Sequence, residues 1–202
     1  MSAATHQDKL DKFNEFFSIE YPFHVNICQI YQSNIPTYEQ FLSQIPMPFK
    51  MATEVMTIDQ AALRPIQGLS GVASQLAEFL NYQSQKIELL VTYILSQQDE
   101  EQHRYCANKF GGGGIVFSSV KPFELGSILE MKLFLLEANC AVYCLGEIIS
   151  TEQLDNNFHH QVIFHYIREE DREILVRNSL HEQSKQLQSL AKKRHIETSG
   201  EK

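Results

Sequence analysis

The stretch that decides the fold is residues 111–135, GGGGIVFSSVKPFELGSILEMKLFL, in which four consecutive glycines lead into sequence of β type. Apolar residues follow a period of two in this stretch, and they do so again in CAVYCLGEIIS (140–150) and NFHHQVIFHYI (157–167). Turn-forming segments separate these stretches, as in chains of antiparallel strands. The C-terminal half therefore predicts a small antiparallel barrel or sandwich.

Helical patterns stand on both sides of this β region. Residues 8–19 place Leu10, Phe13, Phe16 and Phe17 at helical spacing, residues 23–30 suit a short strand, and residues 37–45 suit a short helix. A closing helix is expected over residues 169–193, and its acidic opening EEDRE is expected to be a solvated, capped helix end.

Residues 69–98 predict one long helix with a heptad pattern, because apolar positions recur at alternating steps of four and three. Gln83 in the middle of this seam resembles the polar layer that fixes register in coiled coils. Phe79, Val91 and Tyr93 add a second flank that is expected to face the chain's own domain. The alternative is that the seam itself packs on the barrel. The predicted oligomer interface consists of Leu69, Ala73, Leu76, Leu80, Gln83, Ile87, Leu90 and Ile94.

Three segments follow one another in the C-terminal half: GGGGIVFSSVKPFELGSILEMKLFL, AVYCLGEII and HHQVIFHYIREEDREILVRNSLHEQ. Together they resemble the PilZ domain over about residues 101–190. The resemblance implies a six-stranded antiparallel barrel, and PilZ domains are known mainly as bacterial receptors for cyclic di-GMP. The heptad helix resembles the atypical, tetramer-forming branch of the family. We expect an α+β chain with four parts: a helical and extended wrap (1–66), an oligomerisation helix (67–100), a PilZ-like barrel with its C-terminal helix (101–193) and a flexible tail (194–202).

The resemblance also implies a degenerate nucleotide site. Ordinary PilZ domains use an RxxxR motif ahead of the first strand and [D/N]xSxxG in the following turn, whereas the matching residues 109–114 here read KFGGGG. Arg64 and Arg104 precede the glycines, and neither has a second arginine four positions away. The glycines lack the context of a P-loop and are expected to form a tight, left-handed turn. If nucleotide binds, the expected contacts are Arg104, Asn108, Lys109, Gly111, Gly113 and Gly114.

Composition excludes several other classes of function. The 202 residues carry a net charge of −8 with a pI near 5.5, which argues against nucleic acid as a partner. The four cysteines lack CxxC spacing and no apolar run is long enough to span a bilayer, so a reduced, cytoplasmic location is expected. His159, His160 and His165 do not have the spacing of metal ligands, and no motif brings a nucleophile and a base together.

Two functions remain, and neither is enzymatic. The first is a non-catalytic, homo-oligomeric adaptor in cyclic di-GMP-linked regulation, expected to be a tetramer, with a protein partner and no cofactor. The second is a cyclic di-GMP receptor that binds the nucleotide near the glycine turn. A third class, an enzyme acting on a nucleotide or peptide, would need a catalytic constellation that the sequence does not contain.

Overall fold

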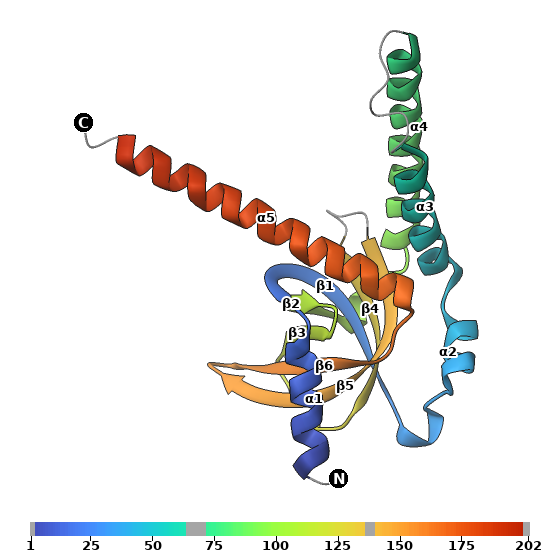
Figure 1. Ribbon diagram of the computed structural model, residues 1–202. Helices are drawn as coiled ribbons and strands as arrows, with labels where there is room; N and C mark the ends of the chain where they lie inside the picture. The colour runs from blue at the N-terminus through green and yellow to red at the C-terminus, as the bar shows by residue number, and fades with distance from the viewer. Residues whose placement is uncertain (1–2, 64–71, 136–139, 200–202) are drawn as a thin grey trace.

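Six antiparallel strands form a closed barrel in the computed structural model, which describes residues 3–63, 72–135 and 140–199 (Figure 1). The strand order around the barrel is β1-β2-β3-β6-β5-β4, so β1 closes it by pairing with both β2 and β4. The expected six-stranded α+β fold is therefore confirmed. The strands are β1 (Ser18–Ile30), β2 (Arg104–Gly111), β3 (Gly114–Ser119), β4 (Ile128–Leu135), β5 (Cys140–Leu154) and β6 (Asn157–Tyr166).

The first strand comes from the N-terminal third of the chain, which corrects the expected division into parts. The apolar pattern predicted the barrel within residues 101–193 and a helical and extended wrap over residues 1–66. In the structure β1 is a full barrel strand, because Val25 and Ile27 alternate into the core and are almost completely buried. Residues 31–103 therefore form an insertion between two neighbouring strands, and β2 is a strand that the apolar pattern did not predict.

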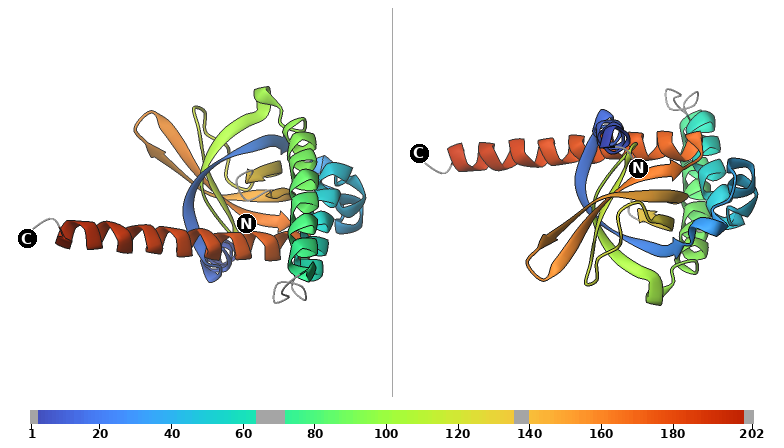
Figure 2. Two further views of the ribbon diagram at one scale, coloured as in Figure 1. Left: turned by 90° about the horizontal axis from the view of Figure 1, so that it is seen from above. Right: turned by 90° about the horizontal axis from the view of Figure 1, so that it is seen from below.

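Within residues 31–63 and 72–103, which the structure describes, the insertion is mainly helical. It contains η1 (Gln32–Asn34), α2 (Tyr38–Gln44), α3 (Met47–Leu63), α4 (Val72–Ser96) and η3 (Glu101–His103). Thr37 caps α2 with a capping box, since its hydroxyl accepts from Gln40 N at 3.3 Å and its own N–H donates to the Gln40 side chain at 2.9 Å. Helices α3 and α4 lie side by side and project from one end of the barrel (Figures 1 and 2).

Two hydrophobic clusters meet at β5, which is buried on both faces over residues 140–149. One face of this strand lines the barrel interior with Val142 and Cys144. The other face packs Tyr143 against Phe41 of α2 and Phe49 of α3. Because helices cover its outer face, β5 reads as a continuous apolar run rather than an alternating one.

The C-terminal helix α5 (Glu169–Ser199) begins on the barrel and extends well past it (Figure 2). Glu169, Glu170 and Glu173 at its start are exposed as expected, but Asp171 is fully buried. Its carboxylate accepts from Arg168 Nη2 at 2.8 Å, from Arg168 Nε at 2.7 Å and from Thr53 Oγ1 at 2.7 Å. Thr53 lies in α3, so this charged cluster fixes α3 to α5. The acidic start of α5 thus includes a buried tertiary contact.

Candidate functional site: the glycine hairpin and the outer face of α4

The glycine run forms the connection between β2, which ends at Gly111, and β3, which begins at Gly114. None of these four glycines has a positive φ, and the one glycine with positive φ among the described residues is Gly126. The expected left-handed turn is therefore wrong. Gly111 ends β2, Gly112 and Gly113 form the bend, and Gly114 begins β3, so these glycines are required for a reason other than a positive φ.

That reason is the close approach of helices and of neighbouring strand backbone to the glycines. A Cβ at Gly111 would lie 2.2 Å from the carbonyl oxygen of Phe17, and one at Gly112 would lie 2.6 Å from both the Phe16 ring and the Val176 side chain. Helix α1 (Ala3–Glu15) supplies Phe13, which is buried at the same hairpin. The space beside the glycines is thus filled by the protein's own aromatic side chains.

Arg172 of α5 holds this arrangement together. Its guanidinium carbon lies 5.3 Å from the centre of the Phe16 ring, which is within the range of a cation–π interaction. Its Nη1 donates a hydrogen bond to the carbonyl oxygen of Gly112. In the middle of α1, Lys9 Nζ lies 2.5 Å from Glu147 Oε1 in β5. Together with Phe13, which contacts the hairpin, this ion pair ties α1 to the barrel.

The structure changes where a phosphate-binding arginine pair should be sought. Since the first barrel strand is β1, the segment ahead of it is α1, which contains Lys9 and Lys12 and no arginine. The long insertion between β1 and β2 separates this segment from the glycine run, so the sequence alone pointed to the residues immediately before the glycines. Arg104 in fact begins β2, about 23 Å along the strand from Gly111. The structure does not bring it to the glycines.

Arg104 is paired instead with Asp99, which its Nε and Nη2 both contact at 2.9 Å. The Asn26 amide nitrogen donates to the same carboxylate at 2.8 Å, and its oxygen accepts from Glu100 N at 2.7 Å. Burial raises the pKa of Asp99, but the hydrogen bonds from Arg104 and Asn26 outweigh it, so its pKa lies below the ordinary value. Arg104 therefore helps to seat the end of the helical insertion on β1.

Asn108 and Lys109 are the two polar members of the expected nucleotide set that do lie near the hairpin. They line an open cleft of about 430 Å³ together with Glu20, Tyr21 and Val116. Both flanking ladders are irregular here, with shifts between Glu20 and Phe23 and between Ala107 and Lys109. Glu20 is the register partner of Lys109, so a carboxylate stands beside the cation that an anionic ligand would need.

Helix α4 presents a broad apolar face to solvent. The predicted seam residues Leu76, Leu80, Ile87, Leu90 and Ile94 are exposed, with Leu90 at 63%. Gln83 is half-buried, Leu69 lies outside the described residues, and Ala73 lies at the start of the helix. The seam therefore does not pack on the chain's own barrel, which removes the alternative interpretation.

The second apolar flank of α4, which was expected to face the chain's own domain, does so only in part. Val91 packs against the cluster under α2 and α3, and Leu95 is fully buried. Phe79 and Tyr93, however, are 56% and 64% exposed, because they lie next to the seam and away from α3. They extend the exposed apolar face, whose large residues are Leu76, Phe79, Leu80, Tyr82, Ile87, Leu89, Leu90, Tyr93 and Ile94; we call this set the α4 outer face.

The polar residues considered for chemistry have structural partners. His160 is fully buried, with Ser119 Oγ 2.8 Å from its Nε2 and Thr151 Oγ1 3.0 Å from its Nδ1. Burial, and secondarily the charge on His159, lowers the pKa of His160. Cys140 and Cys144 are buried as expected. The described residues contain no group of three or more side chains suited to a metal ion.

A sequence profile of the PilZ domain matches residues 81–180 of the chain. No curated protein matches it closely enough to count as a relative. Among solved structures, the chain is similar to a pathogenic protein from Xanthomonas campestris, a tetrameric PilZ domain self-assembled through a helical bundle. The two share 12% identity over 88% of this chain and 96% of that one, with a TM-score of 0.55, which establishes a common fold.

Smaller parts of the chain are similar to other solved structures. The PilZ domain of YcgR from Escherichia coli, determined with c-di-GMP, corresponds to 45% of this chain and 83% of its own, at 12% identity and a TM-score of 0.36. An inhibitor of motility from Bacillus subtilis corresponds to 41% of this chain and 42% of its own, at 15% identity and a TM-score of 0.39. Within the described ranges, no helix has the length and apolarity to cross a membrane.

Proposed function

Because this chain belongs to the PilZ domain family through residues 81–180, we propose that it is a non-catalytic, self-associating adaptor in bacterial cyclic di-GMP-linked regulation. In this proposal α4 helices from several copies, expected to be four, form a bundle that displays the barrels to a protein partner. The α4 outer face carries the proposal, since it exposes nine large apolar side chains along one helix.

Such a face needs a partner for thermodynamic reasons. Burying one large apolar side chain that was exposed contributes about 1.5–3 kcal/mol, so a helix that leaves nine partly exposed gains considerably from association. The width of the face also favours a bundle over a two-stranded coiled coil, because Phe79 and Tyr93 flank the heptad seam and would remain exposed in a simple pair. Gln83 would form the polar layer that fixes register.

The filled glycine hairpin supports an adaptor over a nucleotide receptor. Phe13 and Phe16 occupy the space beside the glycines, and Arg172 contacts the protein's own backbone and ring. A ligand with two phosphates depends on charge-assisted contacts, which guanidinium groups provide best. In this chain Arg104 is committed to Asp99 and lies far from the hairpin.

The alternative, a cyclic di-GMP receptor, rests on the cleft at Asn108 and Lys109. Isothermal titration of cyclic di-GMP into the full chain separates the two functions. We expect no saturable heat at physiological salt. Saturable binding in the micromolar range, lost in Lys109→Ala, would replace the adaptor with the receptor.

Self-association is tested by light scattering after size exclusion. The wild-type chain of 23.3 kDa is expected to elute at a multiple of that mass, and Leu80→Asp with Ile87→Asp is expected to give a folded monomer. The matched control is Asn81→Asp with Gln85→Asp, which adds the same charges at exposed positions outside the α4 outer face. A wild-type monomer, or an unchanged mass in the apolar-face variant, contradicts the proposal.

A further inference from the structure

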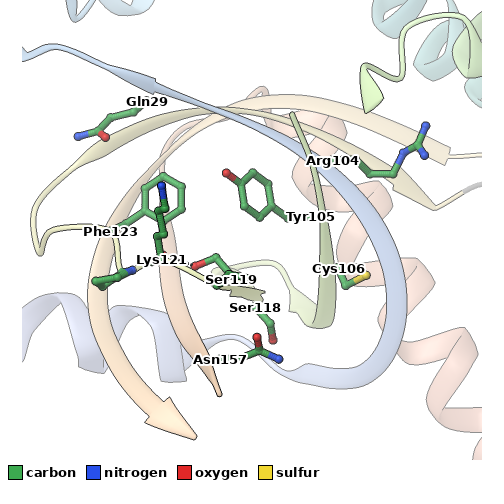
Figure 3. Close-up of a pocket in the computed structure, with 11 residues that line it drawn as sticks. Gln29, Arg104, Tyr105, Cys106, Ser118, Ser119, Lys121, Phe123 and Asn157 are labelled. Atoms are coloured by element: carbon green, nitrogen blue, oxygen red, sulfur yellow. Dashed lines mark hydrogen bonds between the residues drawn. The ribbon is translucent and has the colours of Figure 1, made fainter. Parts of the chain in front are cut away.

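A second cleft opens at the end of the barrel opposite the glycine hairpin. It lies where β2 begins and β3 ends, beside the turn between β5 and β6, and it has a volume of about 650 Å³ (Figure 3). Small-molecule sites are commonly 300–1,000 Å³ in volume and occur in the mouths of β-barrels. Neither the proposed bundle nor the glycine hairpin uses this cleft.

Aromatic rings form its apolar wall. Tyr105 and Phe123 both line the cleft, with ring centres 5.9 Å apart and planes at 69°. Both rings also pack edge-on against buried Phe117, at 5.6 Å each. His160 lies 5.3 Å from Phe123 on the inner side. Rings held by several edge contacts form a rigid surface on which a flat ligand can stack without ordering flexible side chains.

The charge of the cleft is opposite to that of the chain. Its lining includes Arg104 and Lys121 and no carboxylate, in a protein whose net charge is −8. Arg104 is already paired with Asp99. Lys121 makes no ion pair with any residue that the structure describes, so its ammonium is the group available to an incoming anion.

Lys121 is also held in place at the backbone. Ser119 Oγ donates to the carbonyl oxygen of Lys121 at 2.5 Å and lies 2.8 Å from the buried His160 ring. Since Ser119 donates to that carbonyl, it accepts from Nε2 of His160. This chain of hydrogen bonds fixes the loop that carries both Lys121 and Phe123. Ser118, Gln29 and Asn157 complete the lining with neutral polar groups.

We propose that this barrel-mouth cleft binds a small aromatic anion, which stacks on one of the two rings, Tyr105 or Phe123, meets the other edge-on, and places its negative group at Lys121. The aromatic wall would contact the flat part of the ligand, and the positively charged lining would contact its negative group. The neutral side chains at the rim accept or donate hydrogen bonds to polar substituents. The site is independent of the function proposed above, because no residue of it belongs to α4 or to the glycine hairpin.

Saturation-transfer difference NMR on the full-length protein tests the site with a defined pair of probes, 2-naphthoate and its neutral isostere 2-naphthamide. We expect 2-naphthoate to saturate with a Kd below about 1 mM and to bind about fivefold or more tightly than the amide. Lys121→Gln is expected to remove this difference. Lys192→Gln, at an exposed position on α5, is the matched control and is expected to leave it unchanged.

A blocking variant then locates the binding. Ser118→Phe fills the cleft and is expected to abolish binding of both probes. Lys121→Glu changes only an exposed side chain, so it provides the same test through charge reversal if Ser118→Phe fails to fold. Equal binding of the two probes, absence of saturable binding up to about 10 mM, or binding that survives Lys121→Glu overturns the proposal. Probe that binds to the α4 outer face instead of the cleft would still bind to the Lys121→Glu variant.

Discussion

Replacing Gly114 by alanine tests the finding that the glycines serve close packing. A Cβ at this position would lie 1.9 Å from the carbonyl oxygen of Val162, whereas Cβ contacts below 3.0 Å essentially do not occur. Strands β3 and β6 must therefore separate locally by more than an ångström. That shift falls where Gly114 is paired with Ile163 and beside the 3.0 Å hydrogen bond from Phe164 N to Gly113 O.

The expected cost follows from these contacts. Overpacking of this kind costs about 1–3 kcal/mol, and each backbone hydrogen bond weakened adds about 1 kcal/mol. We expect Gly114→Ala to lower the free energy of unfolding by about 3 kcal/mol. For a chain of this size that corresponds to a fall in Tm of about 6–12 °C. Circular dichroism during thermal and urea denaturation, at a fixed protomer concentration, measures both quantities.

Two comparisons make the test specific. Gly113→Ala has its nearest contact at 2.9 Å, so a small adjustment relieves it and less than half of the effect is expected. Gly114→Asn distinguishes packing from conformation, because asparagine tolerates a left-handed backbone better than alanine does. Close packing predicts that asparagine is at least as harmful as alanine. An asparagine variant more stable than the alanine variant, or equal losses at Gly113 and Gly114, would refute the reasoning.

Two further predictions concern buried polar groups. Since the folded-state pKa of His160 lies below its ordinary value of 6.5, the unfolded chain binds more protons at low pH, so stability should fall as pH drops below about 6.5. The urea midpoint should therefore decrease from pH 7.5 to 5.5 by more in the wild type than in His160→Gln; equal decreases contradict this role. Arg168→Ala leaves Asp171 buried without its ion pair and should cost about 3–5 kcal/mol, measured by urea denaturation. A loss below about 1 kcal/mol would mean that the cluster does not fix α3 to α5.

Local pattern was sufficient for much of the fold. Strands β3 to β6 and helix α4 were predictable because each has a long, regular period that matches one buried face, and α2 because Thr37 and Gln40 form a capping box. Helix α3 was missed because prolines at its start suggested an irregular segment. Strand β2 was missed because its alternation is interrupted at Asn108, where the ladder to β3 is irregular.

The candidate site likewise has one part that the local sequence predicted and one part that it did not. The heptad positions of α4 predicted an exposed apolar face, since amphipathic period depends only on local sequence. The role of the glycines was not predictable, because the segments that approach them, residues 13–18 together with β6 and α5, lie about fifty to a hundred residues away in the sequence. Helical spacing of Phe13 and Phe16 was a visible signal that α1 packs on something, but it did not identify the glycine hairpin as the surface.

By itself, the sequence determined the properties that depend on neighbours along the chain: the strands after the glycines, the heptad helix, the missing arginine pair and the acidic net charge. Only the tertiary structure decided which distant segments share a surface. It placed β1 next to β2 across an insertion of more than seventy residues, α1 over the glycines, Asp99 against Asn26, and Lys121 beside Tyr105. Contacts of this kind depend on the closure of the barrel, which no local period specifies.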